Sequence, residues 1–165
     1  MSFFNNHSNC DVTNRVIDIN VKELPDSMLV FALINVCEAV RNQRYKNAYE
    51  GKRTWLYVEE IQSMFKYPTV LNYFSRFANE GRKFGLLLTG ITQNSIAMLE
   101  NEAARNIVLN ADLIMLLKQS PLDRQEWVDL LGLSVQEEEC INESVNPGDG
   151  LLIAGAARVP INGRF

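Results

Sequence analysis

The sequence is short of histidine, of paired cysteines and of long apolar runs. It holds one histidine, His7, and three widely spaced cysteines, Cys10, Cys37 and Cys140, with no Cys-x-x-Cys pair. This argues against a structural zinc site or a disulfide framework, and a reducing cytosolic setting is the default expectation. No apolar run approaches the roughly 20 residues that span a bilayer, and the N-terminus lacks the basic and apolar segments of a signal peptide.

An excess of basic charge is also missing. The 165 residues carry a formal net charge of -4, and the pI is near 5.1. These values argue against a broad basic face that binds nucleic acid, but they do not exclude a local basic patch. Apolar residues make up 47% of the chain, which is enough for the core of one domain. We expect residues 1–11 to be a loose lead-in and residues 12–165 to form that domain.

A phosphate-binding loop is absent from the sequence. The segment Gly51-Lys52-Arg53-Thr54 comes nearest to one, but the motif needs glycine at position 46, where the chain has lysine. Arg53 also occupies the position that the motif reserves for serine or threonine. We therefore interpret this segment as a basic turn that leads into a strand.

Short apolar runs indicate strands. Trp55–Val58, Leu86–Ile91 and Ala111–Leu117 are brief and almost wholly apolar, which is typical of strands buried on both faces. Val12–Ile19 is β-branched and alternating, and it predicts a further strand.

Helix signals separate these runs. Asp26 is a candidate N-cap for a long helix whose apolar residues lie nearly all round it, which implies deep burial. Pro68 suits the first position of a second helix, which we expect to stop at Gly85. Ser120 and Ser134 open two capping boxes and predict two further helix starts.

Strands that alternate with helices indicate an α/β architecture with a mainly parallel sheet. After the turn at residues 146–150, Leu151–Gly155 and Arg158–Ile161 predict a C-terminal antiparallel β-hairpin.

Polar groups follow two of the predicted strands directly. Glu59 and Glu60 come after the first, and Thr92 and Gln93 come after the second. Ligands of open α/β sheets bind beyond the carboxyl ends of the strands, so we expect these groups at one edge. One carboxylate can hold Mg²⁺ through water, the next can orient an attacking water, and an amide can read a terminal phosphate. For Glu59 and Glu60 alone, a strand that simply runs into polar helix residues is an equal alternative.

A basic pair precedes the second of these strands. Arg82 and Lys83 can supply positive charge to a phosphoryl group, either within the subunit or across an interface. The alternative is a helix end whose cations match the helix dipole.

An ordered series of segments resembles the ATPases that energise conjugative type IV secretion systems. The segments are Thr54–Glu60, Arg82–Gly85, Thr89–Asn94, Asn110–Asp112, Gln119–Arg124, Leu131–Ser134 and Pro147–Leu151. The resemblance implies a RecA-like, three-layer motor domain that drives DNA or protein substrates through a membrane channel. Such motors usually work as hexamers at the cytoplasmic face of the bacterial inner membrane, with membrane-bound channel components as partners.

The resemblance also implies roles for the polar groups. Glu59 and Glu60 match the Walker B element, with Glu59 as the magnesium ligand and Glu60 as the catalytic carboxylate. Gln93, beside Thr92, matches the residue that senses the nucleotide phosphate. The family usually has Asp-Glu at the Walker B position, so the extra methylene of Glu59 would move the magnesium ligand outward. ATP and Mg²⁺ would be the cofactors of a full-length parent.

The same resemblance assigns Arg82 and Lys83 to a basic motif near the subunit interface. In the family, the phosphate-loop strand lies between the strands that correspond to Leu86–Ile91 and Ala111–Leu117, and this sequence lacks it. We expect these two strands to pair directly, or the free edge to serve self-association, because unpaired strand edges are costly or sticky.

Three functional hypotheses follow. The first is the Walker B, sensor and basic part of a secretion ATPase, inactive by itself. The second is a DNA-translocating, coupling-type motor domain, for which a more basic surface would be expected. The third is a non-catalytic α/β protein-interaction module whose carboxylates are only surface charge.

Overall fold

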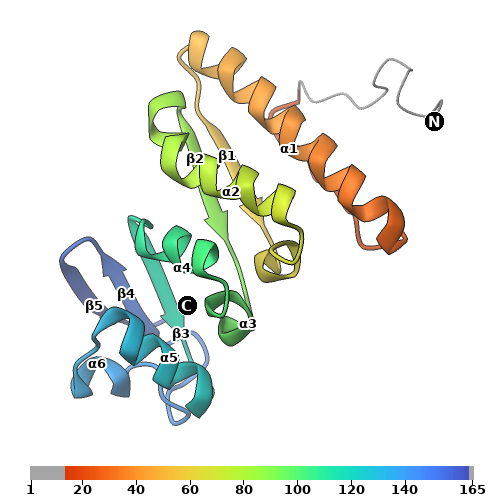
Figure 1. Cartoon of the computed structure of the whole chain (residues 1–165). Helices are drawn as coiled ribbons and strands as arrows, with labels where there is room; N and C mark the ends of the chain where they lie inside the picture. The colour runs from red at the N-terminus through yellow and green to blue at the C-terminus, as the bar shows by residue number, and fades with distance from the viewer. Residues whose placement is uncertain (1–13, 164–165) are drawn as a thin grey trace.

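The computed structural model describes residues 14–163. The expected lead-in, with His7 and Cys10, lies outside the described residues. The elements in chain order are α1 (Asp26–Tyr49), β1 (Thr54–Val58), the 3₁₀ helix η2 (Ile61–Met64), α2 (Pro68–Glu80), the 3₁₀ helix η3 (Gly81–Phe84), β2 (Leu86–Gly90), α3 (Ser95–Leu99), α4 (Glu102–Leu109), β3 (Leu113–Leu117), α5 (Pro121–Leu131), α6 (Val135–Glu139), β4 (Gly150–Ala154) and β5 (Ala157–Ile161) (Figure 1).

The strands form two small sheets. β1 and β2 are parallel, and Thr54 lies opposite Leu86 while Val58 lies opposite Gly90. β3, β4 and β5 form an antiparallel sheet in that order. The predicted α/β class and the C-terminal hairpin are therefore confirmed.

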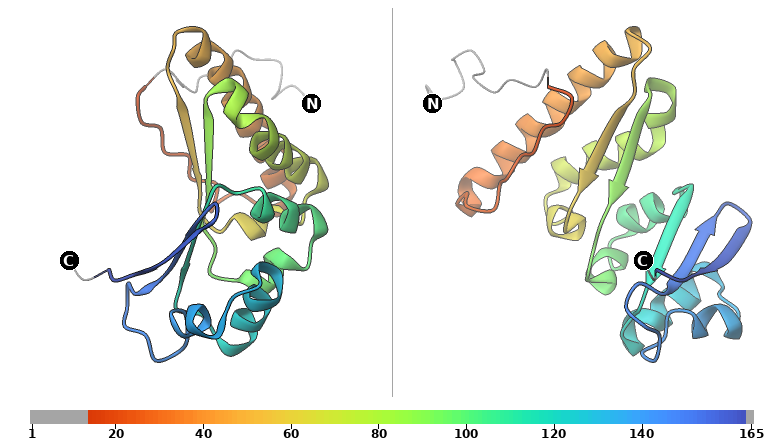
Figure 2. Two further views of the ribbon diagram at one scale, coloured as in Figure 1. Left: turned by 90° about the vertical axis from the view of Figure 1, so that its left-hand side faces the viewer. Right: turned by 180° about the vertical axis from the view of Figure 1, so that it is seen from behind.

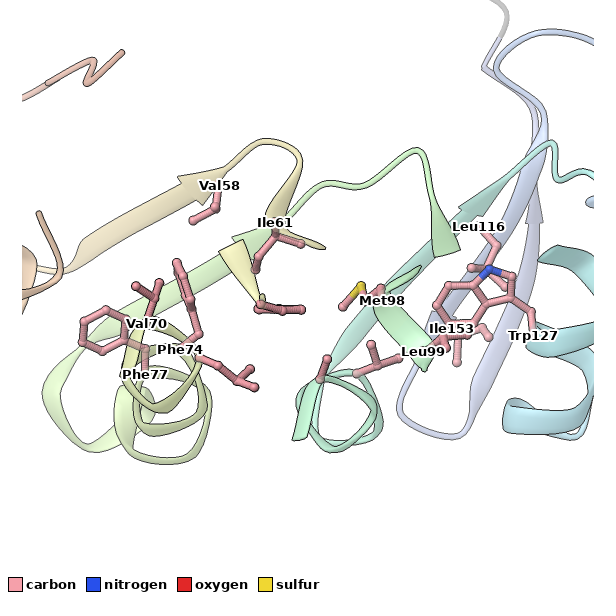
Figure 3. Packing of buried hydrophobic residues seen from close by; sticks show 14 of the residues in the cluster. Val58, Ile61, Val70, Phe74, Phe77, Met98, Leu99, Leu116, Trp127 and Ile153 are labelled. Carbon is pink, nitrogen blue, oxygen red and sulfur yellow. The ribbon is translucent and has the colours of Figure 1, made fainter. Parts of the chain in front are cut away.

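The expected direct pairing of β2 with β3 is wrong. Within the described residues β2 bonds only to β1, and β3 bonds only to β4. The views agree that β2 and β3 run in the same direction as parts of separate sheets (Figures 1 and 2). The core nevertheless continues from one sheet to the other, since Met98 and Leu99 of α3 lie between Phe74 and Trp127 (Figure 3). Self-association through the free edges stays a prediction.

The strands are buried on one face, and not on both as their composition suggested. Val58 and Leu116 point into the core, whereas Trp55 and Tyr57 are 59% and 58% exposed and Met115 is also exposed. In the left view of Figure 2, the helices lie to one side of the strands. The alternation follows from the two-residue period of a strand, since only one face of each sheet has a helical neighbour in the described part.

The first helix starts as predicted but differs in its cap and its burial. Pro25 occupies the N-cap position without a side-chain hydrogen bond, and Asp26 is the first helical residue, where a carboxylate suits the helix dipole. The expected deep burial is wrong, because only Leu33, Cys37 and Arg44 are buried. The helix lies at the margin of the molecule, so that only one side of it contacts α2, β1 and η3.

The strand predicted over Val12–Ile19 is not formed in its described part. Residues 14–19 are irregular, and Val16, Ile17 and Ile19 are exposed. They form no ladder with any strand of the described chain, and β-branched composition alone does not make a strand.

The helix boundaries predicted from local signals are confirmed. Pro68 is the first residue of α2, and Gly85 ends the helical stretch in a left-handed conformation with φ of 63°. The Ser120 side chain caps α5, and Ser134 with Glu137 forms a complete capping box on α6.

Candidate functional site

The parallel register of β1 and β2 places the polar groups that follow them at one edge. The pairing continues past the strands, since the Ile91 N–H donates to the Val58 carbonyl at 2.9 Å. The Ile61 N–H then donates to the Ile91 carbonyl at 3.1 Å. Glu59 and Glu60 on one chain segment therefore lie at the same end of the sheet as the turn that begins at Thr92.

Glu60 has an unusual backbone conformation. Its φ of 49° and ψ of 44° are left-handed, and no other non-glycine residue of the described chain has a positive φ. For an L-residue this conformation costs roughly 1–2 kcal/mol, and such strain concentrates at functional sites. The next residue, Ile61, is only 1% exposed and packs closely against Gly90, where an added Cβ would lie 2.9 Å from Ile61 Cδ1.

The two carboxylates have different surroundings. The Glu60 carboxylate accepts a hydrogen bond from the Gln62 side-chain amide, whose own oxygen is buried without a partner in the described part. Glu59 is exposed, and nothing in residues 14–163 donates to its side chain. Glu60 is thus oriented by the protein, while Glu59 is open to an outside ligand.

The turn after β2 is ordered by its own side chains. The Asn94 N–H donates to Thr92 Oγ1 at 3.1 Å, and the Asn94 side chain accepts from the Ala97 N–H at 3.0 Å as the N-cap of α3. Gln93 lies between these anchors, is exposed, and makes no side-chain hydrogen bond within the described residues. A fixed turn with an available amide suits a sensing role.

A buried polar network behind this turn was missed by sequence reasoning. The Trp127 indole N–H donates to Ser95 Oγ at 2.9 Å, and Ser95 Oγ donates to Gln119 Oε1 at 3.2 Å. Asp123 accepts from the Ile96 N–H at 3.2 Å. The network joins the ends of β2 and β3. The only sequence signal for this network was the segment Gln119–Arg124, which resembles the secretion ATPases but for which no role was predicted.

The basic pair lies at the other end of β2. Arg82 and Lys83 belong to η3, which precedes Leu86, and the five residues of β2 extend over about 13 Å at roughly 3.3 Å per residue. The structure therefore does not bring the basic pair to the carboxylates within one chain. Its place in the last turn of a helical stretch also agrees with the helix-dipole alternative.

Arg82 instead forms a two-pronged pair with Asp112, just before β3. Arg82 Nε donates to Asp112 Oδ2 at 3.1 Å, and Arg82 Nη2 donates to Asp112 Oδ1. The side chains are 75% and 72% exposed, so the pair adds at most about 1 kcal/mol to stability.

The donor set suits part of a magnesium–nucleotide site. Mg²⁺ is commonly held by one or two carboxylates together with substrate phosphates, and Glu59 fits the carboxylate part. A group of three or more metal-binding side chains is not found among residues 14–163. A concavity of about 410 Å³ lies elsewhere, between Arg124, Val135 and Glu143.

The parallel pair, the helical face and the antiparallel hairpin define a mixed α/β fold. Among solved structures, the chain is similar to VirB4 of Thermoanaerobacter pseudethanolicus, with a TM-score of 0.70 and 25% sequence identity. The likeness covers 81% of this chain and 36% of that one, so this chain spans well under half of VirB4. No family model and no curated protein matches the sequence. Within the described residues, none of the helices has the length and apolar character to cross a membrane.

Proposed function

We propose that this chain supplies the hydrolytic half of the ATP site of a type IV secretion ATPase. The observation that carries the proposal is the in-register parallel pairing of β1 with β2, which gathers two carboxylates and an amide at one edge. The likeness to VirB4 supports the secretion context.

The roles follow from the different surroundings of the side chains. Glu60, held by Gln62 and by its strained backbone, orients the attacking water and accepts its proton. Glu59 would hold Mg²⁺, and the bound ion would neutralise charge on the nucleotide phosphates. Gln93, on the turn anchored by Thr92, contacts the terminal phosphate and senses its loss.

This half-site is incomplete, and we infer that the chain alone does not hydrolyse ATP. No phosphate-binding loop exists in the sequence to grip the nucleotide. The free edges of β2 and β3 favour completion by a further strand, and the exposed apolar face around Trp55, Tyr57 and Met115 favours an additional covering layer.

The separation of the basic pair from the carboxylates supports action across an interface. Arg82 and Lys83 would then contact the phosphates bound to a neighbouring subunit, as in a hexameric parent. In that setting the motor lies in the cytoplasm against the inner membrane, contacts membrane-bound channel components, and transfers protein or DNA.

Nucleotide binding and DNA binding test this proposal together. Fluorescent ATP is titrated into the chain alone and into a polypeptide in which a strand and a Gly-x-x-x-x-Gly-Lys-Ser/Thr loop precede it. We expect magnesium-dependent binding and hydrolysis only in the completed protein. Salt-sensitive DNA binding by the chain alone would instead support the DNA-translocating motor. If the completed protein binds no nucleotide, the result would support the non-catalytic protein-interaction module.

A further inference from the structure

Arg44 is a buried arginine that the proposed site does not use. Its side chain, on α1, is 1% exposed. The guanidinium carbon lies 4.9 Å from the ring centre of Tyr45, 5.4 Å from that of Phe77 and 4.9 Å from that of Phe84. The rings belong to α1, α2 and η3, so one cation contacts three elements. Within the described chain, Nε and Nη1 have no hydrogen-bond acceptor.

The acidic partner of Arg44 lies at ion-pair distance but does not form a hydrogen bond with it. Glu80 Oε2 lies 3.7 Å from Arg44 Nη2, and the same carboxylate is 3.8 Å from Arg76 Nε. Both distances exceed a hydrogen bond, and Arg44 Nη2 donates instead to the Tyr45 hydroxyl at 3.3 Å. The ion pair with Glu80 and the three aromatic faces together compensate for the buried charge. Stability alone is a weak reason for an arginine here, since apolar residues often replace buried charges without loss.

The aromatic contacts fall on the turn that carries the basic pair. Phe84 is the last residue of η3, directly after Arg82 and Lys83. The turn is tight at both ends: a Cβ on Gly81 would lie 2.7 Å from the Leu86 carbonyl oxygen, and Gly85 is left-handed. Between these ends, the Phe84 ring is the side chain of η3 that is anchored to the core, and its anchor is Arg44 together with the edge of Tyr45.

We propose that Arg44 is a positioning residue, which holds η3 through Phe84 and thereby fixes Arg82 and Lys83 at the amino end of β2. Fixing η3 also fixes the Arg82–Asp112 link, which joins two sheets that share no backbone hydrogen bond in the described part. The functional meaning of the positioned pair rests on the proposed function, but the positioning itself is measurable in the chain alone.

Hydrogen exchange by NMR tests the positioning. In Arg44→Met the three rings keep an apolar neighbour but lose the cation, and we expect the chain to stay folded. In this variant the Gly85 amide, which donates to the Arg82 carbonyl, and the Thr54 amide, which donates to the Gly85 carbonyl, should exchange about tenfold faster. The Arg82 Nε–H signal should lose its protection. Arg76→Met is the matched control, because it removes the other arginine near Glu80 from an exposed position. It should leave these signals unchanged.

Phe84→Leu gives a second route to the same result, should Arg44→Met fail to fold. It removes the ring from the turn and leaves Arg44 in place, and it should accelerate the same two amides. The proposal is overturned if the folded variants exchange as the wild type does at residues 81–86. It is equally overturned if exchange accelerates uniformly over the chain, since that indicates a general loss of packing. Neither result depends on ATP hydrolysis, so failure of the proposed function would be seen separately.

Discussion

The contact between Gly90 and Ile61 locks together the two strand ends that carry the candidate site, and Gly90→Ala tests it. An ideal Cβ on Gly90 would lie 2.9 Å from Ile61 Cδ1 and 3.2 Å from Ile61 Cγ2. Ile61 is 1% exposed and has little room to retreat, and it is the first residue of η2. Overpacking of this kind costs about 1–3 kcal/mol, and the movable Cδ1 methyl places the cost in the lower half of that range.

A double-mutant cycle isolates the contact. Ile61→Val removes Cδ1 and should cost about 0.5–1.5 kcal/mol by itself. In Gly90→Ala with Ile61→Val the clash with Cδ1 is absent, so the double variant should be more stable than the sum of the single effects predicts, by about 1 kcal/mol. Urea unfolding followed by circular dichroism measures the cycle, and each kcal/mol corresponds to roughly 2–4 °C in Tm. Strict additivity would refute the close contact between Gly90 and Ile61.

Three further predictions concern other parts of the chain. Burial, with the Glu38 charge adding to it, raises the pKa of Cys37 to about 12, so iodoacetamide at pH 8 should label Cys140 but not Cys37 until the chain unfolds, as mass spectrometry would show. A hydrogen bond from the Ser134 backbone N–H lowers the pKa of Glu137 below its ordinary 4.5. The charged Glu137 should therefore contribute its full stability above pH 4.5 and lose that contribution as the pH falls through the lowered pKa. The free energies of unfolding of the wild type and Glu137→Gln, measured with urea, should converge in acid. Arg82→Ala should lower the free energy of unfolding by less than about 1 kcal/mol in the same assay.

Features set by a few neighbouring residues were predictable from the sequence. The three short strands, the hairpin after residue 150, and the helix boundaries at Pro68 and Ser134 depend on local turn and capping chemistry. The common edge of the Glu59 and Thr92 segments follows from parallel pairing alone, so the sequence pattern was sufficient for that too.

Features that depend on tertiary neighbours were not predictable. An apolar run cannot show whether one or both of its faces is covered, so Trp55 and Met115 were expected in the core and are exposed. The same applies to α1, whose apolar residues surround the helix although only one side has a neighbour. Strand Val12–Ile19 and the β2–β3 pairing both depend on which segments lie side by side in the fold, and the apolar pattern does not carry that information. The Ser95–Gln119–Trp127 network joins residues far apart in the chain, and no periodic pattern marks it.

The most direct test of the central claim is ATP hydrolysis by the chain completed with a phosphate-binding loop, compared between Glu60→Gln and Glu126→Gln. Glu126 is an exposed glutamate of α5 that takes no part in the candidate site, so its variant controls for the loss of one charge. We predict that Glu60→Gln binds ATP as the wild type does but hydrolyses it at least about 100-fold more slowly, since it lacks the base that orients and deprotonates water. Equal hydrolysis rates in the two variants would contradict the assignment of Glu60 and, with it, the claim that this edge is half of an ATP site.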